Sequence, residues 1–173
     1  MRKIILMLSI VAPLGAVSQT SLLYPISLFI LDDKSITVYD TNTIDKKEVA
    51  KVSDYYEYEL RWGIIVRRKE NGFYFVEMEF EGVKGQYVAG WIQLENTGIW
   101  LTCHSDKKIY LYEMPNENSE SIAVSMDKIN GEYKVYDVDM GNGFVQIKWN
   151  DGKYYWVSQI NQCTNPFTTC TGN

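Results

Sequence analysis

Hydrophobic and polar residues alternate most regularly between positions 143 and 157. Val145, Ile147 and Trp149 are separated by single polar residues, the period-two pattern of a strand with one buried face. The Asn150–Lys153 segment that follows contains Asp-Gly, a pair that tolerates the positive φ angles of a tight hairpin turn. The segment therefore predicts a complete β-hairpin.

An earlier segment, 72–92, has the same pattern. One set of alternating residues is apolar or aromatic and consists of Tyr74, Val76, Met78 and Phe80. The residues between and after them are Phe75 and three glutamates. The chain then turns through Gly82–Gly85 and returns to Gly90-Trp91-Ile92. This segment predicts a second hairpin, in which Val76 is equivalent to Ile147 and both are buried.

The similarity between the two segments extends upstream. Asp33–Tyr39 aligns with Asp106–Tyr112 at an offset of 73 residues, the Gly-Phe pairs align at 71, and the closing tryptophans align at 65. Three matches in the same order indicate an internal duplication. Most of the length difference falls in the hairpin turn, where insertions are tolerated.

Composition supports an all-β fold with two units. The 173-residue chain has thirteen Tyr, twelve Gly and four Pro, which suits short strands and tight turns. We expect the units to span 19–100 and 101–173, with Thr97 to Ser105 as a short connection. Because each unit is near the lower size limit for burying a core alone, we expect the two to pack on each other.

The first eighteen residues have the pattern of a signal peptide. Arg2 and Lys3 precede an apolar run from Ile4 to Ala12, and Ala16-Val17-Ser18 supplies small residues at the cleavage positions. The sequence therefore predicts cleavage after Ser18 and export to the periplasm or the extracellular space. The apolar run is too short to span a bilayer, so no stable membrane insertion is expected.

Net charge narrows the range of partners. The formal charge is −5, and removal of residues 1–18 takes away two basic residues and no acid, which leaves −7. An acidic protein of this kind is repelled by phosphate backbones and anionic lipids. We therefore expect no nucleic-acid partner.

The cysteines fit an oxidising compartment. Cys163 and Cys170 flank a polar, turn-rich loop near the C-terminus, where a disulfide would hold the chain end in place. We predict that these two are bonded and that Cys103 is a buried small residue. A bond from Cys103 to either of the others is the alternative, because spacing does not determine connectivity.

Several short motifs resemble those of the bacterial Src-homology-3-like (SH3-like) domain family. They are a Val-Tyr or Leu-Tyr strand before a polar loop, a Gly-Phe strand, and a closing Gly-Trp-Ile or Tyr-Trp-Val. The resemblance covers residues 26–94 and 105–160. The second copy departs from it at Tyr155, which replaces the glycine before Trp156.

The resemblance implies two small five- to six-stranded barrels that bind cell-wall peptide or protein, often attached to a peptidase. Such peptidases use a Cys nucleophile with a His base. The single histidine here, His104, directly follows Cys103, and neighbours on a strand point to opposite faces. We therefore expect no enzyme activity, no cofactor and no metal site. The glutamates at 77, 79 and 81 fall on one face of a strand, and we expect that face to be solvated.

Aromatic residues are the main candidates for binding. We expect Trp91, Trp149 and Trp156 in the core. Tyrosine can line a binding groove at low entropic cost. The predicted groove residues are the tyrosines that lie beside turns or next to an inward-facing Trp, namely Tyr39, Tyr55, Tyr56, Tyr112 and Tyr155. The Arg67-Arg68-Lys69 run is expected to be solvated, to pair with Glu79, or to recognise a carboxylate.

Two functional hypotheses follow. In the first, the protein is a non-catalytic binding protein that recognises cell-wall peptide or an envelope protein through aromatic grooves. In the second, it is a secreted or periplasmic inhibitor or immunity-type protein whose acidic surface blocks a basic enzyme.

Overall fold

The computed structural model describes residues 25–53, 61–80, 85–102, 108–129 and 131–163. Within these ranges the chain forms β-strands and short 3₁₀ turns and no α-helix. The predicted all-β class is therefore confirmed.

The described residues of the first half contain six strands and one 3₁₀ turn: β1 (Ile26–Ile30), β2 (Ser35–Tyr39), β3 (Glu48–Ser53), β4 (Trp62–Glu70), β5 (Phe73–Phe80), β6 (Tyr87–Ile92) and η2 (Leu94–Asn96). The rest of the described chain contains β7 (Thr97–Leu101), β8 (Lys108–Tyr112), β9 (Ser121–Ser125), η3 (Met126–Lys128), β10 (Tyr133–Asp139), β11 (Phe144–Lys148), β12 (Tyr154–Ser158), η4 (Gln159–Asn161) and β13 (Gln162–Cys163).

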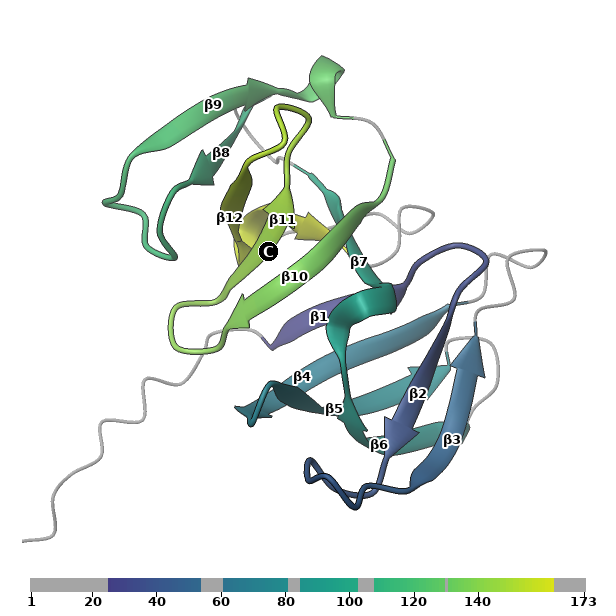
Figure 1. The fold of residues 1–173 in the computed structure, drawn as a ribbon. Coiled ribbons are helices and arrows are strands. Elements are labelled where there is room, and N and C mark those ends of the chain that lie inside the picture. The colour runs from purple at the N-terminus through teal and green to yellow at the C-terminus, as the bar shows by residue number, and fades with distance from the viewer. Residues whose placement is uncertain (1–24, 54–60, 81–84, 103–107, 130, 164–173) are drawn as a thin grey trace, which may run out of the picture.

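Strand pairing follows the same order in both halves (Figure 1). The first half runs β1-β4-β5-β6-β2-β3, and the second runs β7-β10-β11-β12-β8-β9. Each half also ends in a strand that follows a 3₁₀ turn and pairs with its own first strand, β7 with β1 and β13 with β7. The order of pairing is thus repeated along the chain, as the internal similarity of the sequence predicted.

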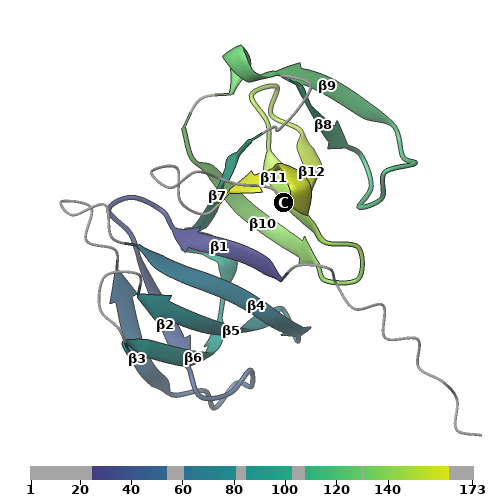
Figure 2. The same cartoon turned by 180° about the vertical axis from the view of Figure 1, so that it is seen from behind.

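One strand, β7, belongs to both halves. It pairs antiparallel with β1 and β13 and also with β10, so β1, β7 and β10 lie side by side at the centre of the molecule (Figure 2). Thr97 to Ser105 was expected to join the two units, and Thr97–Leu101 of this segment form the shared strand. The predicted boundary between residues 100 and 101 falls inside this strand.

The strands form a single thirteen-stranded antiparallel sheet. Among the described residues, no strand pair closes either half into a barrel. The repeated pairing order is therefore established, whereas two separate barrels stay a hypothesis.

Local irregularities are repeated as well. The β4–β5 ladder shifts register between Val66 and Arg68, and the β10–β11 ladder shifts between Val135 and Asp137. Gly72 and Gly143 precede the equivalent strands β5 and β11 with φ angles of +76° and +74°. Glycine adopts this region without steric cost, which accounts for the Gly-Phe pair in both copies.

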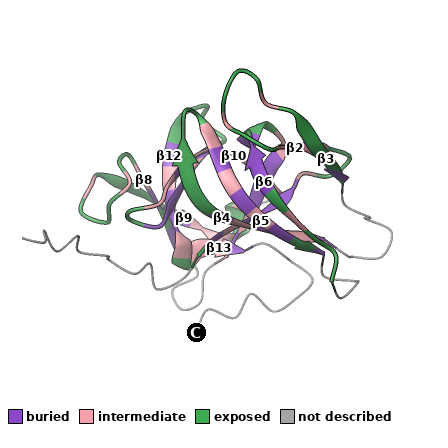
Figure 3. Cartoon of the chain, turned by 90° about the horizontal axis from the view of Figure 1, so that it is seen from below, coloured by how far each residue is buried: buried purple, intermediate pink, exposed green. Residues whose placement is uncertain are grey.

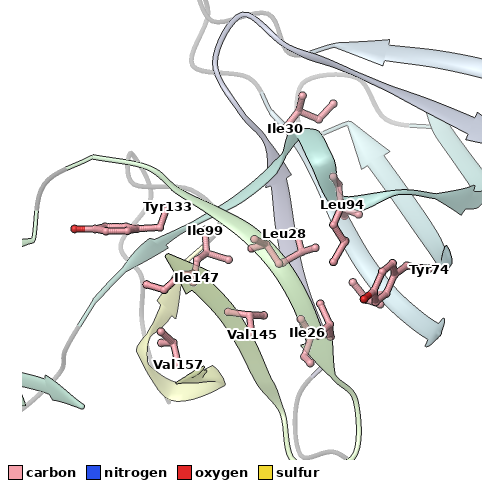
Figure 4. Packing of buried hydrophobic residues seen from close by; sticks show 14 of the residues in the cluster. Ile26, Leu28, Ile30, Tyr74, Leu94, Ile99, Tyr133, Val145, Ile147 and Val157 are labelled. Atoms are coloured by element: carbon pink, nitrogen blue, oxygen red, sulfur yellow. The ribbon is translucent and has the colours of Figure 1, made fainter. Parts of the chain in front are cut away.

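The core is continuous across the two halves. Val76 and Ile147 are both fully buried at equivalent positions, as predicted. Figure 4 shows Leu28 of the first half beside Ile99 of β7, with Ile147 and Val145 on the side of the second half. Buried and partly exposed residues alternate along β10 (Figure 3), as expected for a strand with one core face.

No helix among the described residues is long and apolar enough to cross a membrane.

Candidate functional site

Two of the five predicted groove tyrosines occupy equivalent places. Tyr39 ends β2 and pairs with Trp91, while Tyr112 ends β8 and pairs with Trp156. Each tyrosine ring is partly exposed. Each also makes an edge-on contact with the phenylalanine that begins β5 or β11. The Tyr39–Phe73 centroids are 6.1 Å apart at 89°, and those of Tyr112 and Phe144 are 5.6 Å apart at 87°. The edge contact fixes both rings while leaving part of each accessible.

A small polar groove lies beside Tyr39. Its volume is about 210 Å³, and β2, β3 and the η2 region supply its lining, which includes Thr37, Tyr39, Lys51, Gln93 and Glu95. The Lys46 ammonium lies 5.1 Å from the Tyr39 ring centre and 4.9 Å from that of Phe73. Tyr39 therefore combines a fixed aromatic face with neighbouring polar groups.

Tyr112 has a different neighbourhood. Its ring centre lies 6.5 Å from that of Tyr110, so two partly exposed tyrosines adjoin on β8. Burial, together with the charge of Glu117 and the neighbouring Tyr110, raises the pKa of Tyr112. The phenol therefore stays protonated at neutral pH and can donate a hydrogen bond.

The structure places Tyr155 in the core rather than in a groove. Only 5% of its surface is exposed, and its hydroxyl donates to Asp151 Oδ2 at 3.0 Å. At the equivalent position in the first half, a Cβ on Gly90 would lie 2.5 Å from a Val38 methyl group and 2.7 Å from the Tyr39 carbonyl oxygen. The remaining candidates, Tyr55 and Tyr56, lie outside the described residues.

The expectation that all three tryptophans are core residues holds only in part. Trp91 is buried, whereas Trp149 and Trp156 are partly exposed. Trp149 stacks on Tyr133 at a centroid distance of 5.5 Å and packs against the core. Trp156 instead lines a cleft, which sequence reasoning missed.

This cleft lies between the two halves and has a volume of about 600 Å³. The end of β4 supplies one side of it, and the second half supplies the other through the loop after β8, the end of β10 and β12. The lining residues are Arg67, Arg68, Lys69, Pro115, Asp137, Val138, Asp139, Met140 and Trp156.

Two of the three cations in the cleft are neutralised by carboxylates. Arg67 pairs with Glu77 at 2.6 Å, rather than with Glu79 as one expectation had it. Lys69 donates to Asp137 at 2.5 Å, an ion pair that joins the two halves. Arg68 instead lies over aromatic rings, with its guanidinium carbon 4.8 Å from the Trp91 centroid and 5.5 Å from that of Phe75.

Asp137 is held by several donors at once. Besides Lys69, the Tyr74 hydroxyl and the Val138 amide each donate to its Oδ1 at 2.6 Å. Burial raises the pKa of Asp137, but the hydrogen bonds from Lys69 and Tyr74 outweigh burial and hold this pKa below its ordinary value. Asp137 is therefore an ionised carboxylate whose Oδ1 accepts from three donors.

Metal and disulfide chemistry can be placed only for part of the chain. Across the described ranges, no group of three or more His, Cys, Asp or Glu side chains is arranged to hold a metal ion. Cys163 is disulfide-bonded. Its partner lies outside the described residues, as do Cys103 and Cys170, so the pairing with Cys170 stays a prediction.

Comparison with protein-family models finds no family that matches the chain, and comparison with curated proteins finds none that is similar. Among solved structures, the chain is similar to the structure of NlpC2 from Trichomonas vaginalis, with a TM-score of 0.31 and 15% identity. The similarity covers 82% of this chain and 49% of that one, so this chain spans about half the length of that protein. A likeness at this level adds nothing to the functional argument.

Proposed function

We propose that the chain is a non-catalytic, exported binding protein built from two SH3-like units, which recognises cell-wall peptide or an envelope protein. The observation that carries this proposal is the repeated tyrosine at the end of β2 and β8. In both halves it is partly exposed, is fixed edge-on by a phenylalanine and lies opposite a tryptophan.

The physical reason is that a rigid aromatic side chain loses little entropy when a ligand orders it. Tyr39 also has polar neighbours in its groove, among them Thr37, Lys51 and Glu95, which supply hydrogen-bond partners for a peptide backbone. An aromatic anchor beside a few fixed polar groups is the arrangement found in binding pockets.

The test is a pull-down on purified cell-wall sacculi, followed by titration with soluble wall fragments. Tyr39→Ala and Tyr112→Ala should each weaken binding by about 1–3 kcal/mol, the range for an interface aromatic. Tyr87→Ala is the matched control, because Tyr87 is 57% exposed in the first half and does not line the groove.

Thermal melts of the same variants separate binding from folding. A large fall in melting temperature with unchanged affinity would make Tyr39 and Tyr112 core residues and leave the binding site elsewhere. Failure of the unaltered protein to bind sacculi or an envelope protein would reject the proposed function itself.

A further inference from the structure

We propose that the cleft between the two halves binds a carboxylate that carries an adjacent apolar or aromatic group, and that Arg68 binds the carboxylate. This site lies apart from the groove beside Tyr39, and the inference does not rest on the proposed function.

One cation of the cleft has no carboxylate partner among the described residues. Of the three consecutive cations at the end of β4, Arg67 and Lys69 pair with Glu77 and Asp137. Arg68 makes no ion pair in the part of the chain that the structure describes, although it lines the same cleft. A guanidinium is always charged at physiological pH, so the cleft holds one positive charge without a carboxylate partner.

The Arg68 side chain is held beside two aromatic rings. Its guanidinium lies over the rings of Trp91 and Phe75, at 4.8 Å and 5.5 Å from their centroids. Among the described residues the Arg68 side chain donates no hydrogen bond, so its N–H groups are available to a ligand. Two parallel N–H groups of this kind match the two oxygens of one carboxylate.

The two acidic residues that line the cleft are each held by donors other than Arg68. Asp137 accepts from Lys69, Tyr74 and Val138. The carboxylate of Asp139 accepts from the amides of Gly141 and Asn142 and from the Asn142 side chain, which fixes the β10–β11 turn. An external anion is therefore the better partner for Arg68.

The cleft also has an apolar wall, to which Trp156, Met140 and Pro115 contribute. The equivalent tryptophan, Trp91, is covered by Arg68 and Phe75. In the second half, the positions that match Arg68 and Phe75 hold Asp137 and Gln146, and Trp156 stays partly exposed. The opening of about 600 Å³ is in the size range of small-molecule and peptide pockets.

The experiment uses the whole chain and two matched probes, N-acetylphenylalanine and its amide. Titration calorimetry and protein NMR should show saturable binding of the acid with a dissociation constant on the order of 1 mM. The amide, which has the same ring but no charge, should bind at least about tenfold more weakly. This comparison tests the charge requirement without any substitution.

Substitutions then locate the site. Arg68→Met keeps the aliphatic stem over Trp91 and should weaken binding of the acid about tenfold, whereas Lys148→Met removes an exposed cation that does not line the cleft and should change it less than about twofold. Trp156→Leu should also weaken binding, and Tyr39→Ala should leave it unchanged.

Three results would overturn the proposal. The first is that the acid shows no saturable binding at a concentration of about ten times the expected dissociation constant. The second is that the acid and the amide bind equally well. The third is that a folded Arg68→Met variant binds the acid with unchanged affinity. Because Tyr39 lies outside the cleft, loss of wall binding in Tyr39→Ala with intact binding of the acid would separate the two sites.

Discussion

Arg61 and Glu132 form an ion pair that joins the two halves of the molecule. Nη1 of Arg61, just before β4, lies 3.2 Å from Oε1 of Glu132, just before β10. Nη2 of the same guanidinium lies 2.9 Å from Asp32 Oδ1, and the Asp32 amide donates to Glu132 at 3.1 Å. Arg61 is only 2% exposed, so its charge depends on these carboxylates rather than on water.

Removal of this buried cation should destabilise the fold strongly. Arg61→Met leaves Glu132 without its counter-charge, and we expect a loss of about 3 kcal/mol in the free energy of unfolding, as for other broken buried pairs. Arg67→Met is the control because it breaks the exposed Arg67–Glu77 pair, which should cost less than about 1 kcal/mol. Urea unfolding at neutral pH measures both, and equal losses would show that Arg61 has no special structural role.

The cluster of Asp137, Lys69 and Tyr74 should make stability depend on pH in the acid range. The folded-state pKa of Asp137 lies below its unfolded value, so its contribution to stability is present above about pH 4 and is lost as the pH falls through the folded pKa. The stability difference between the unaltered protein and Asp137→Asn should therefore shrink between about pH 5 and pH 2. A constant difference across this range would contradict the assignment.

The same cluster predicts an alkaline effect. Burial and the hydrogen bond to Asp137 raise the pKa of Tyr74, so its contribution is intact below about pH 10 and is lost as the pH rises beyond that value. Tyr74→Phe should lose less stability than the unaltered protein between about pH 10 and pH 12. Unfolding curves at alkaline pH measure this, with ultraviolet titration to count the phenols that ionise late.

Tyr155 should behave as a core residue. Tyr155→Ala removes a buried ring, and we expect a fall of roughly 10 °C in melting temperature. Tyr154→Ala, one residue away and 49% exposed, should change it by no more than about 2 °C. If the two variants melt alike, the placement of Tyr155 in the core is wrong.

The strands that the sequence predicted best are those with one buried face. The alternation around Val76 and Ile147 located both hairpins because each strand has a core face and a solvent face. β7 was missed for the opposite reason. Its residues are buried at every position except Trp100, so no polar residue marks a solvent face, and the segment was taken for a connection.

The sequence likewise predicted only those site residues that a local motif places. Tyr39 and Tyr112 were predictable because a local motif at the end of a strand places them. The cleft was not, because it brings together Arg68, Pro115 and Trp156, which are far apart in sequence. The repeat also suggested that Trp156 would be as buried as Trp91, but burial depends on the cross-strand neighbours, which the two copies do not share.

The last prediction concerns the disulfide of Cys163. β13 pairs with β7 so that Cys163 lies opposite Trp100, and the Thr102 amide donates to the Asn161 carbonyl one step further along. Cys163 and Cys170 flank a polar, turn-rich loop near the C-terminus, where a disulfide would hold the chain end in place, so we expect the bond to join these two rather than Cys163 and Cys103. A peptide map of the non-reduced protein should yield one cross-linked fragment with both C-terminal cysteines and a free Cys103 thiol. A Cys103–Cys163 fragment would instead refute this pairing. Such a bond would link the shared strand β7 to the C-terminal region of the second half, and Cys103→Ser would then destabilise the protein while Cys170→Ser would not.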